Sequence, residues 1–118
     1  MTGVPEMLRA ANDFAALQHS TRSRSERLLV VRLATNDKER TRFGIATGRR
    51  IGGAVVRNKV RRRIRESLRA LAPRINIGWD VLIVARPESA TASMAELAGT
   101  LERLLRKAGA LRAEGTEV

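Results

Sequence analysis

The residues best suited to chemistry in this sequence are arginines and lysines gathered in one short stretch. Residues 49–74 contain ten basic side chains and one acidic side chain, Glu66, so they carry +9 of the chain's net charge of +11. A guanidinium can bind a phosphate through two parallel hydrogen bonds and can stack on a nucleobase. This stretch therefore predicts a surface that binds a polyanion, with nucleic acid as the first candidate and an anionic membrane surface as the second.

The apolar residues within this stretch predict a helix from Val55 to about Leu71, which Pro73 ends. They recur at spacings of three or four residues, namely Val56, Val60, Ile64, Leu68 and Leu71. We expect the opposite, exposed face to hold polar residues only, namely Asn58, Lys59, Arg61, Arg62, Arg65 and Arg69. Arg57 and Arg63 fall at the flanks, and Arg49 and Arg50 lie just before the helix.

A charged helix face is usually a solvated surface with salt bridges between successive turns, but this reading fits poorly here. Glu66 is the only acid available to pair with these cations. Like charges four residues apart, such as Arg57 and Arg61, destabilise an isolated helix by a few tenths of a kcal/mol. The pattern therefore favours a binding face. Asn58 has two readings, because its amide can contact a base edge or a 2′-hydroxyl, or it can bond to the backbone near the helix start.

Three apolar segments predict the strands that must position this helix. Residues 28–34 and 42–47 are expected to pair as an antiparallel hairpin, and residues 80–85 form a central strand that is buried on both faces. Residues 19–27 suggest a loop or a short irregular strand.

Two further helices are expected at the ends of the chain. One runs from Asn12 or Asp13 to about Gln18, and the other starts at the capping box Ser93–Glu96 and ends at Gly109. The sequence therefore predicts an α+β two-layer sandwich, a small mixed sheet with helices in the order α-β-β-(β)-α-β-α. Residues 1–118 are expected to form one domain, with flexible ends at about 1–8 and 112–118.

Several classes of function receive no support from the sequence. The chain has no cysteine, no apolar run of membrane-spanning length and no apolar core of a signal peptide, so we expect a cytoplasmic protein. His19 is the only histidine, the acids are scattered and no phosphate-binding glycine loop is present. We therefore expect no catalytic residue and no metal site on this chain.

The order of these features resembles the signature of the bacterial ribonuclease P protein component. That family has a strand that ends in a basic pair, a short glycine-containing turn, and then Arg-Asn-Arg/Lys at the start of an arginine-rich helix. In this sequence the match begins within the strand at Phe43, and the strand is followed by Arg49-Arg50, Gly52-Gly53 and Arg57-Asn58-Lys59. The specific match extends over residues 43–66, and the looser resemblance covers about residues 8–110.

The resemblance implies a function beyond what the residues alone predict. The chain would be the protein subunit of an endoribonuclease that removes the 5′ leader from precursor tRNA, with one catalytic RNA subunit per protein. The RNA and its Mg²⁺ ions would perform the chemistry. The family fold also implies a left-handed β-α-β crossover through the basic helix, an exception to the usual right-handed rule.

The resemblance also implies particular binding residues. The residues that match the family's RNA-facing positions are Arg49, Arg50, Arg57, Asn58, Lys59, Arg61, Arg62 and Arg65. Phe14 and Arg32 match a cleft that holds the single-stranded leader, although Arg32 replaces an aromatic residue of some members and Gln18 replaces another. Because stacking contributes about 1–3 kcal/mol per base, we expect the leader to be held here more by charge.

Two other functions are compatible with the basic helix. The chain could be a stand-alone module that binds structured RNA, such as a ribosomal protein, or a nuclease that needs no RNA subunit. Readers of duplex DNA are usually helical bundles or dimers, so the predicted strands make that class a poor match.

Overall fold

The computed structural model describes residues 6–7, 17 and 22–112. Within these ranges the strands are β1 (Glu6–Met7), β2 (Arg22–Ser25), β3 (Leu29–Thr35), β4 (Arg42–Thr47) and β5 (Trp79–Ala85). The α-helices are α2 (Ala54–Leu71) and α3 (Met94–Ala108). Short 3-10 segments connect them, namely η1 (Arg49–Ile51), η2 (Ala72–Arg74) and η3 (Pro87–Thr91). The predicted basic helix and buried strand are both confirmed.

The strands form one mixed sheet in the order β1-β4-β5-β3-β2. β5 pairs in parallel with β4 and antiparallel with β3, so the expected hairpin between β3 and β4 is wrong. β5 is the most apolar strand and has to be covered on both sides, and it therefore takes the position between them. The segment of residues 19–27, read as a loop or a short irregular strand, contains β2 as a regular edge strand.

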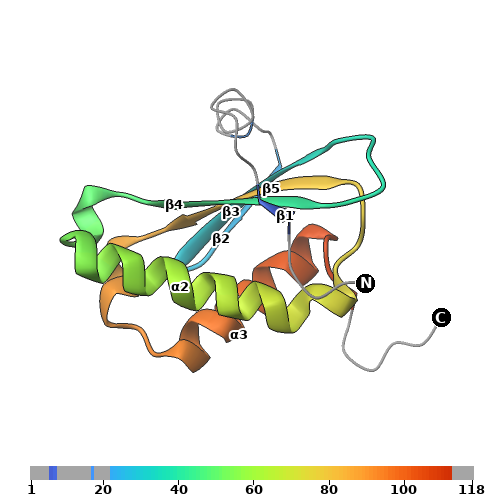
Figure 1. Cartoon of the computed structure of the whole chain (residues 1–118). Coiled ribbons are helices and arrows are strands. Elements are labelled where there is room, and N and C mark those ends of the chain that lie inside the picture. Colours follow the sequence, from blue (N-terminus) through green and yellow to red (C-terminus); the bar gives the residue numbers. More distant parts are fainter. Residues whose placement is uncertain (1–5, 8–16, 18–21, 113–118) are drawn as a thin grey trace.

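Both helices cover the same face of the sheet (Figure 1). Every second residue of the central strands points toward them, and these side chains join the helices in one aliphatic core. Among the fully buried members are Leu29, Val31, Val81, Ile83, Val60, Ile64, Leu68, Leu97 and Leu101. The α+β sandwich with a mixed sheet is thus confirmed, although the strand order differs from the prediction. α2 joins the parallel neighbours β4 and β5, as the implied crossover requires.

The opposite face of the sheet has its own smaller apolar cluster. Leu82 on β5 is buried there together with Leu17, and Ala34, Ala46 and Val84 pack against them. The helix expected from Asn12 or Asp13 to Gln18 lies outside the described residues except for Leu17. β5 therefore contributes buried side chains to both faces, as the sequence predicts.

The boundaries of α3 follow the sequence signals. The Ser93 hydroxyl accepts from the Glu96 N–H, and the Glu96 carboxylate accepts from the Ser93 N–H, which forms the predicted capping box. Gly109 ends the helix with φ of +88°, a left-handed conformation that favours glycine. Arg112 lies where the flexible tail was expected to begin, but its side chain donates to the Pro73 carbonyl at 2.5 Å.

Candidate nucleic-acid interface

The basic helix α2 begins directly after a pair of glycines. Gly52 has φ of +151°, and a Cβ at this position would lie 3.2 Å from the Cβ of Val56, so a side chain would be strained and crowded here. Gly53 is the N-cap and has no side chain that could bond to the first N–H groups. The first turn of α2 also contains no acidic residue, so this helix end keeps its partial positive charge.

The exposed face of α2 carries cations without carboxylate partners. Asn58, Arg62, Arg65 and Arg69 are exposed, whereas the predicted apolar stripe packs against the sheet and α3. Within the described residues, no ion pair involves an arginine or lysine of α2. Glu66 is exposed and forms no such pair either. Within the described part of the chain, the cations of this face therefore have no carboxylate that neutralises them.

Arg61 does not lie on the exposed face as predicted. Its side chain is half-buried, and its guanidinium donates to the hydroxyl of Thr47 at the end of β4 and, at 2.9 Å, to Oδ1 of Asn58. Thr47 is only 9% exposed, so this contact fixes α2 against the sheet. The bond from Arg61 also fixes the Asn58 amide, whose NH₂ group remains available to donate. Arg61 thus connects the core with the exposed face.

The flanks of α2 are also partly covered. Arg57 is half-buried on one flank, and its Nε is buried without a hydrogen-bond partner in the described part of the molecule. Lys59, which was predicted on the exposed face, is half-buried as well. Arg63 lies on the other flank and donates to the carbonyl of Ala92 at 2.6 Å. An unsatisfied buried donor costs about 1–3 kcal/mol, so this N–H is an unfavourable feature of the Arg57 side chain as it is placed here.

Arg49 and Arg50 extend the charged surface beyond the helix. Both are exposed and lie in η1, between the end of β4 and the start of α2. Ile51 of the same turn is buried and anchors it. The structure therefore places the basic pair beside the first turn of α2, and the predicted residues of the two segments are brought together on one part of the surface.

Arg32, one of the two residues assigned to the expected leader cleft, lies on the opposite face of the sheet. Arg32 on β3 is half-buried and lines a hollow of about 310 Å³ together with Ala46, Leu82 and Val84. Phe14, the other residue assigned to this cleft, lies outside the described residues, as does Gln18. The structure therefore shows an open apolar hollow with a cationic side chain beside it, separate from the α2 surface.

The carboxylates near the sheet are engaged in structural contacts. Arg42 donates to both oxygens of Asp80 at 2.9 and 2.6 Å, and Asn36 donates to Oδ1 at 2.9 Å. Burial alone would raise the pKa of Asp80, but these hydrogen bonds and the charges of Arg42 and Lys38 together lower it. Three hydrogen bonds thus favour the carboxylate form of Asp80, which suits a structural role better than proton transfer.

No catalytic or metal centre emerges from the part of the chain that the structure describes. Its aspartate and glutamate side chains form no group of three that could hold a metal ion. His19 lies outside the described residues. No helix in the described ranges is long and apolar enough to cross a membrane. What the geometry offers is a fixed basic surface, which can bind an extended anion.

Comparison with known proteins identifies the family behind this arrangement. A family model described as Ribonuclease P matches residues 4–109. The chain belongs to the ribonuclease P protein family. The ribonuclease P protein component of Roseiflexus castenholzii is 35% identical over 111 residues, which cover 93% of this chain and 91% of that protein. The one from Acidothermus cellulolyticus is 41% identical over 100 residues, 83% of each chain.

Solved structures of ribonuclease P proteins share the fold. The Staphylococcus aureus RNase P protein superposes with a TM-score of 0.82 at 26% identity, over 90% of this chain and 97% of that one. The Thermotoga maritima RNase P protein gives a TM-score of 0.79 at 27% identity, over 86% and 96% of the two chains. These similarities confirm the family resemblance that the basic segment indicated.

Proposed function

We propose that this protein binds the catalytic RNA of ribonuclease P through α2 and η1 and helps that RNA to remove the 5′ leader from precursor tRNA. Membership of the family makes the chain the protein component of an endoribonuclease holoenzyme with an RNA partner. The observation that carries the finer proposal is the exposed face of α2, where arginines lie without carboxylate partners in the described part of the chain. Such a face needs an external polyanion to neutralise it.

Each residue of this surface has a role that its surroundings suggest. Arg49, Arg50, Arg62 and Arg65 are exposed and would bind phosphates. Arg57, which is half-buried, would add charge at the edge of this surface. Lys59 would add charge from the flank of the helix.

Asn58 and Arg61 act as a pair in this proposal. The carbonyl oxygen of the Asn58 amide already accepts from Arg61. Asn58 therefore offers N–H donors to the RNA, which suits base acceptors or a ribose oxygen. Arg61 would hold this amide in place as well as contribute charge.

The hollow on the opposite face would hold the single-stranded leader. It combines apolar strand residues with the cation of Arg32, a pairing that suits bases and phosphates of an extended strand. Phe14 would add a stacking surface there. Two RNA contacts on separate faces would let one protein join the catalytic RNA and the precursor, in a complex with one copy of each.

The chemistry is proposed to take place on the RNA with its Mg²⁺ ions. The described residues provide no metal-ligating cluster, and the proposed binding surface is positively charged, so RNA phosphates are the better ligands for Mg²⁺. When bound, the metal would supply an activated water and stabilise the developing charge. The protein would position the two RNAs, and we place this activity in the cytoplasm.

The test is cleavage of a precursor tRNA by the RNA subunit of this protein's own ribonuclease P, transcribed in vitro, at low Mg²⁺. Adding the protein is expected to increase the rate or the affinity for the precursor, and the double variant Arg62→Ala/Arg65→Ala is expected to lose most of this gain. Lys107→Ala, an exposed cation at the end of α3, is the matched control. No gain from the wild-type protein would refute the proposal, and cleavage by protein free of RNA would favour a protein-only nuclease.

A further inference from the structure

One end of the sheet gathers arginines from three separate strand ends. In the register of the sheet, Thr47 of β4, Ala85 of β5 and Leu29 of β3 lie side by side. The segments beyond these residues therefore meet at the same end of the sheet. They carry four arginines, which we call the sheet-end row, namely Arg27, Arg49, Arg50 and Arg86.

The backbone holds this row together. The Arg86 N–H donates to the carbonyl of Leu28 at 2.9 Å, which extends the pairing of β5 with β3 by one residue. On the other side, η1 packs against η3, so Arg49 and Arg50 stay close to the segment that follows β5. The left part of Figure 1 shows the end of β4, η1 and the start of α2 close together. The backbone positions of the four arginines are thus set by the end of the sheet and by the packing of η1 on η3.

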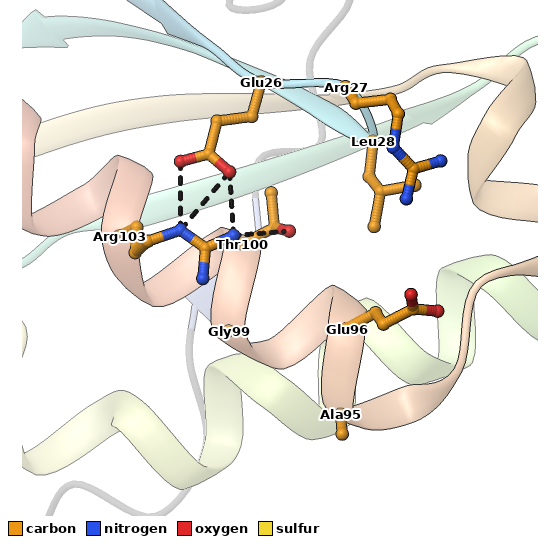
Figure 2. A pocket seen from close by; sticks show the side chains of 8 residues that line it. All are labelled: Glu26, Arg27, Leu28, Ala95, Glu96, Gly99, Thr100 and Arg103. Atoms are coloured by element: carbon orange, nitrogen blue, oxygen red, sulfur yellow. Dashed lines mark hydrogen bonds and ion pairs between the residues drawn. The ribbon is translucent and has the colours of Figure 1, made fainter.

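The side chains of the row are exposed and form no ion pair within the described residues. Figure 2 shows Arg27 at the rim of an open pocket of about 240 Å³, where Glu26 is held by Arg103 at 2.8 Å while Arg27 is not bonded to any residue drawn. Glu96 faces the same pocket. The hydrogen bond from the Ser93 N–H lowers the pKa of the Glu96 carboxyl, and the charge of Arg27 lowers it further, although Arg27 and Glu96 form no ion pair.

Acidic residues at this end are outnumbered. The glutamates near the row are Glu26, Glu88 and Glu96, against the four arginines of the row and Arg103. Glu26 is neutralised by its pair with Arg103, whose hydrogen bond lowers the pKa of the Glu26 carboxyl. A net positive charge therefore remains at the sheet end.

The first turn of α2 adds a second source of positive potential beside the row. α3 starts with a serine cap and an acidic residue in its first turn, whereas α2 starts with a glycine cap and none. The first N–H groups of α2 thus remain open to an anion. Gly53 and Ala54 are exposed and Val55 is 83% exposed, so this end of α2 lies at the surface of the described part of the molecule.

From these observations we propose that the sheet-end row and the first turn of α2 bind phosphates of the catalytic RNA, as a continuation of the α2 surface toward α3. The proposal rests on the proposed function, because Arg49 and Arg50 belong to both surfaces. It adds Arg27 and Arg86, which are far from the basic helix in sequence. We assign the RNA subunit, and not the precursor tRNA, as the ligand of the sheet-end row, because the row continues the α2 surface that is proposed to bind the RNA subunit.

The first test measures the affinity of the protein for the RNA subunit against salt concentration. The logarithm of the association constant falls as the logarithm of the salt concentration rises, and each lost phosphate contact should reduce the steepness of this slope by about 0.7–0.9. We expect Arg27→Ala and Arg86→Ala to lower it by about that much each, and Arg86→Lys to retain most of the wild-type slope. Lys38→Ala, at the opposite end of the sheet, and Lys107→Ala should leave it unchanged.

The outcomes separate this proposal from the proposed function. If Arg62→Ala/Arg65→Ala lowers the slope but Arg27→Ala and Arg86→Ala do not, the sheet-end row is not an RNA contact, and the role of α2 stands. If only the sheet-end variants lower it, the row binds RNA and the assignment of α2 fails. If the sheet-end variants weaken only the binding of precursor tRNA to the holoenzyme, the choice of RNA is wrong.

The second test uses the exposed Val55. A glutamate in the first turn of α2 interacts favourably with the helix end, so Val55→Glu should unfold at the same or a higher urea concentration than wild type. The same carboxylate would repel a phosphate at this position, so RNA binding should weaken severalfold. Val55→Gln is the neutral control and should bind like wild type. Equal RNA affinity of Val55→Glu and Val55→Gln would refute the role of this helix end.

Discussion

Arg61 and Arg65 lie one turn apart on α2, and the structure predicts different consequences when each is replaced by alanine. Arg61 bonds to Thr47 and Asn58, whereas Arg65 is exposed. Because Thr47 is 9% exposed, Arg61→Ala leaves a buried hydroxyl without this partner. Such a loss lowers the free energy of unfolding by about 1–3 kcal/mol. Arg65→Ala removes an exposed side chain and should change it by less than about 0.5 kcal/mol.

Two measurements separate the roles. Urea unfolding, followed by the fluorescence of the single tryptophan, gives the free energy of unfolding of each variant. Binding to the RNA subunit at several salt concentrations gives the charge contribution. We expect Arg65→Ala to lower the salt slope by about 0.7–0.9. Arg61→Ala should weaken binding with a smaller change of slope, because part of its effect comes from the freed Asn58 amide.

A double-mutant cycle tests this last step. If Arg61 positions Asn58, the losses of RNA affinity in Asn58→Ala and Arg61→Ala should not add, with a coupling energy of about 0.5–3 kcal/mol. Thr47→Val is the control for stability alone, since it removes the hydroxyl and leaves the Asn58–Arg61 bond. Equal stability of Arg61→Ala and Arg65→Ala, or additive losses in the cycle, would show that Arg61 is simply another exposed phosphate contact.

Two further predictions concern the scaffold. The pKa of Asp80 is lowered below its ordinary value of 3.8, so its stabilisation is complete above that pH and is lost as pH falls toward the lowered value. Asp80→Asn should therefore lower the free energy of unfolding by about 1–3 kcal/mol at pH 7. In urea unfolding at pH 3, the difference between this variant and wild type should be smaller, and an equal difference at both pH values would contradict the prediction. The guanidinium of Arg22 lies 5.2 Å from the centroid of the Trp79 ring, and Arg22→Gln should alter the tryptophan emission and cost about 0.5–1 kcal/mol, whereas unchanged emission and stability would argue against the contact.

The sequence predicted where the helices and strands lie in the chain more accurately than it predicted which strands pair with each other. Periodicity located α2, and the apolar run located β5, because burial of each is visible within its own residues. The order of the strands depends on which segments compete for the same pairing positions, and the residues of a single segment do not reveal the outcome. β3 and β4 are consecutive and short, a pattern that favours a hairpin, but β5 needs cover on both faces and displaces that pairing.

The same limit applies to the binding surface. Residue types located the cations, and helical phase separated Arg62 and Arg65 from the apolar stripe. Arg61 follows the buried Val60 by one residue, about 100° around the helix. It therefore lies at the boundary between the buried and exposed faces of α2, where its burial depends on the neighbouring element. Thr47 provides the contact to Arg61 from β4, 14 residues earlier. In the sequence, the only sign of this contact is a polar residue, Thr47, at the end of a predicted strand. The packing of α2 on β4 is what brings Thr47 next to Arg61. Within α2, the arginines whose side chains are free to meet a ligand are therefore those farthest from the sheet, whereas Arg61, which lies nearer to it, also holds the helix in position.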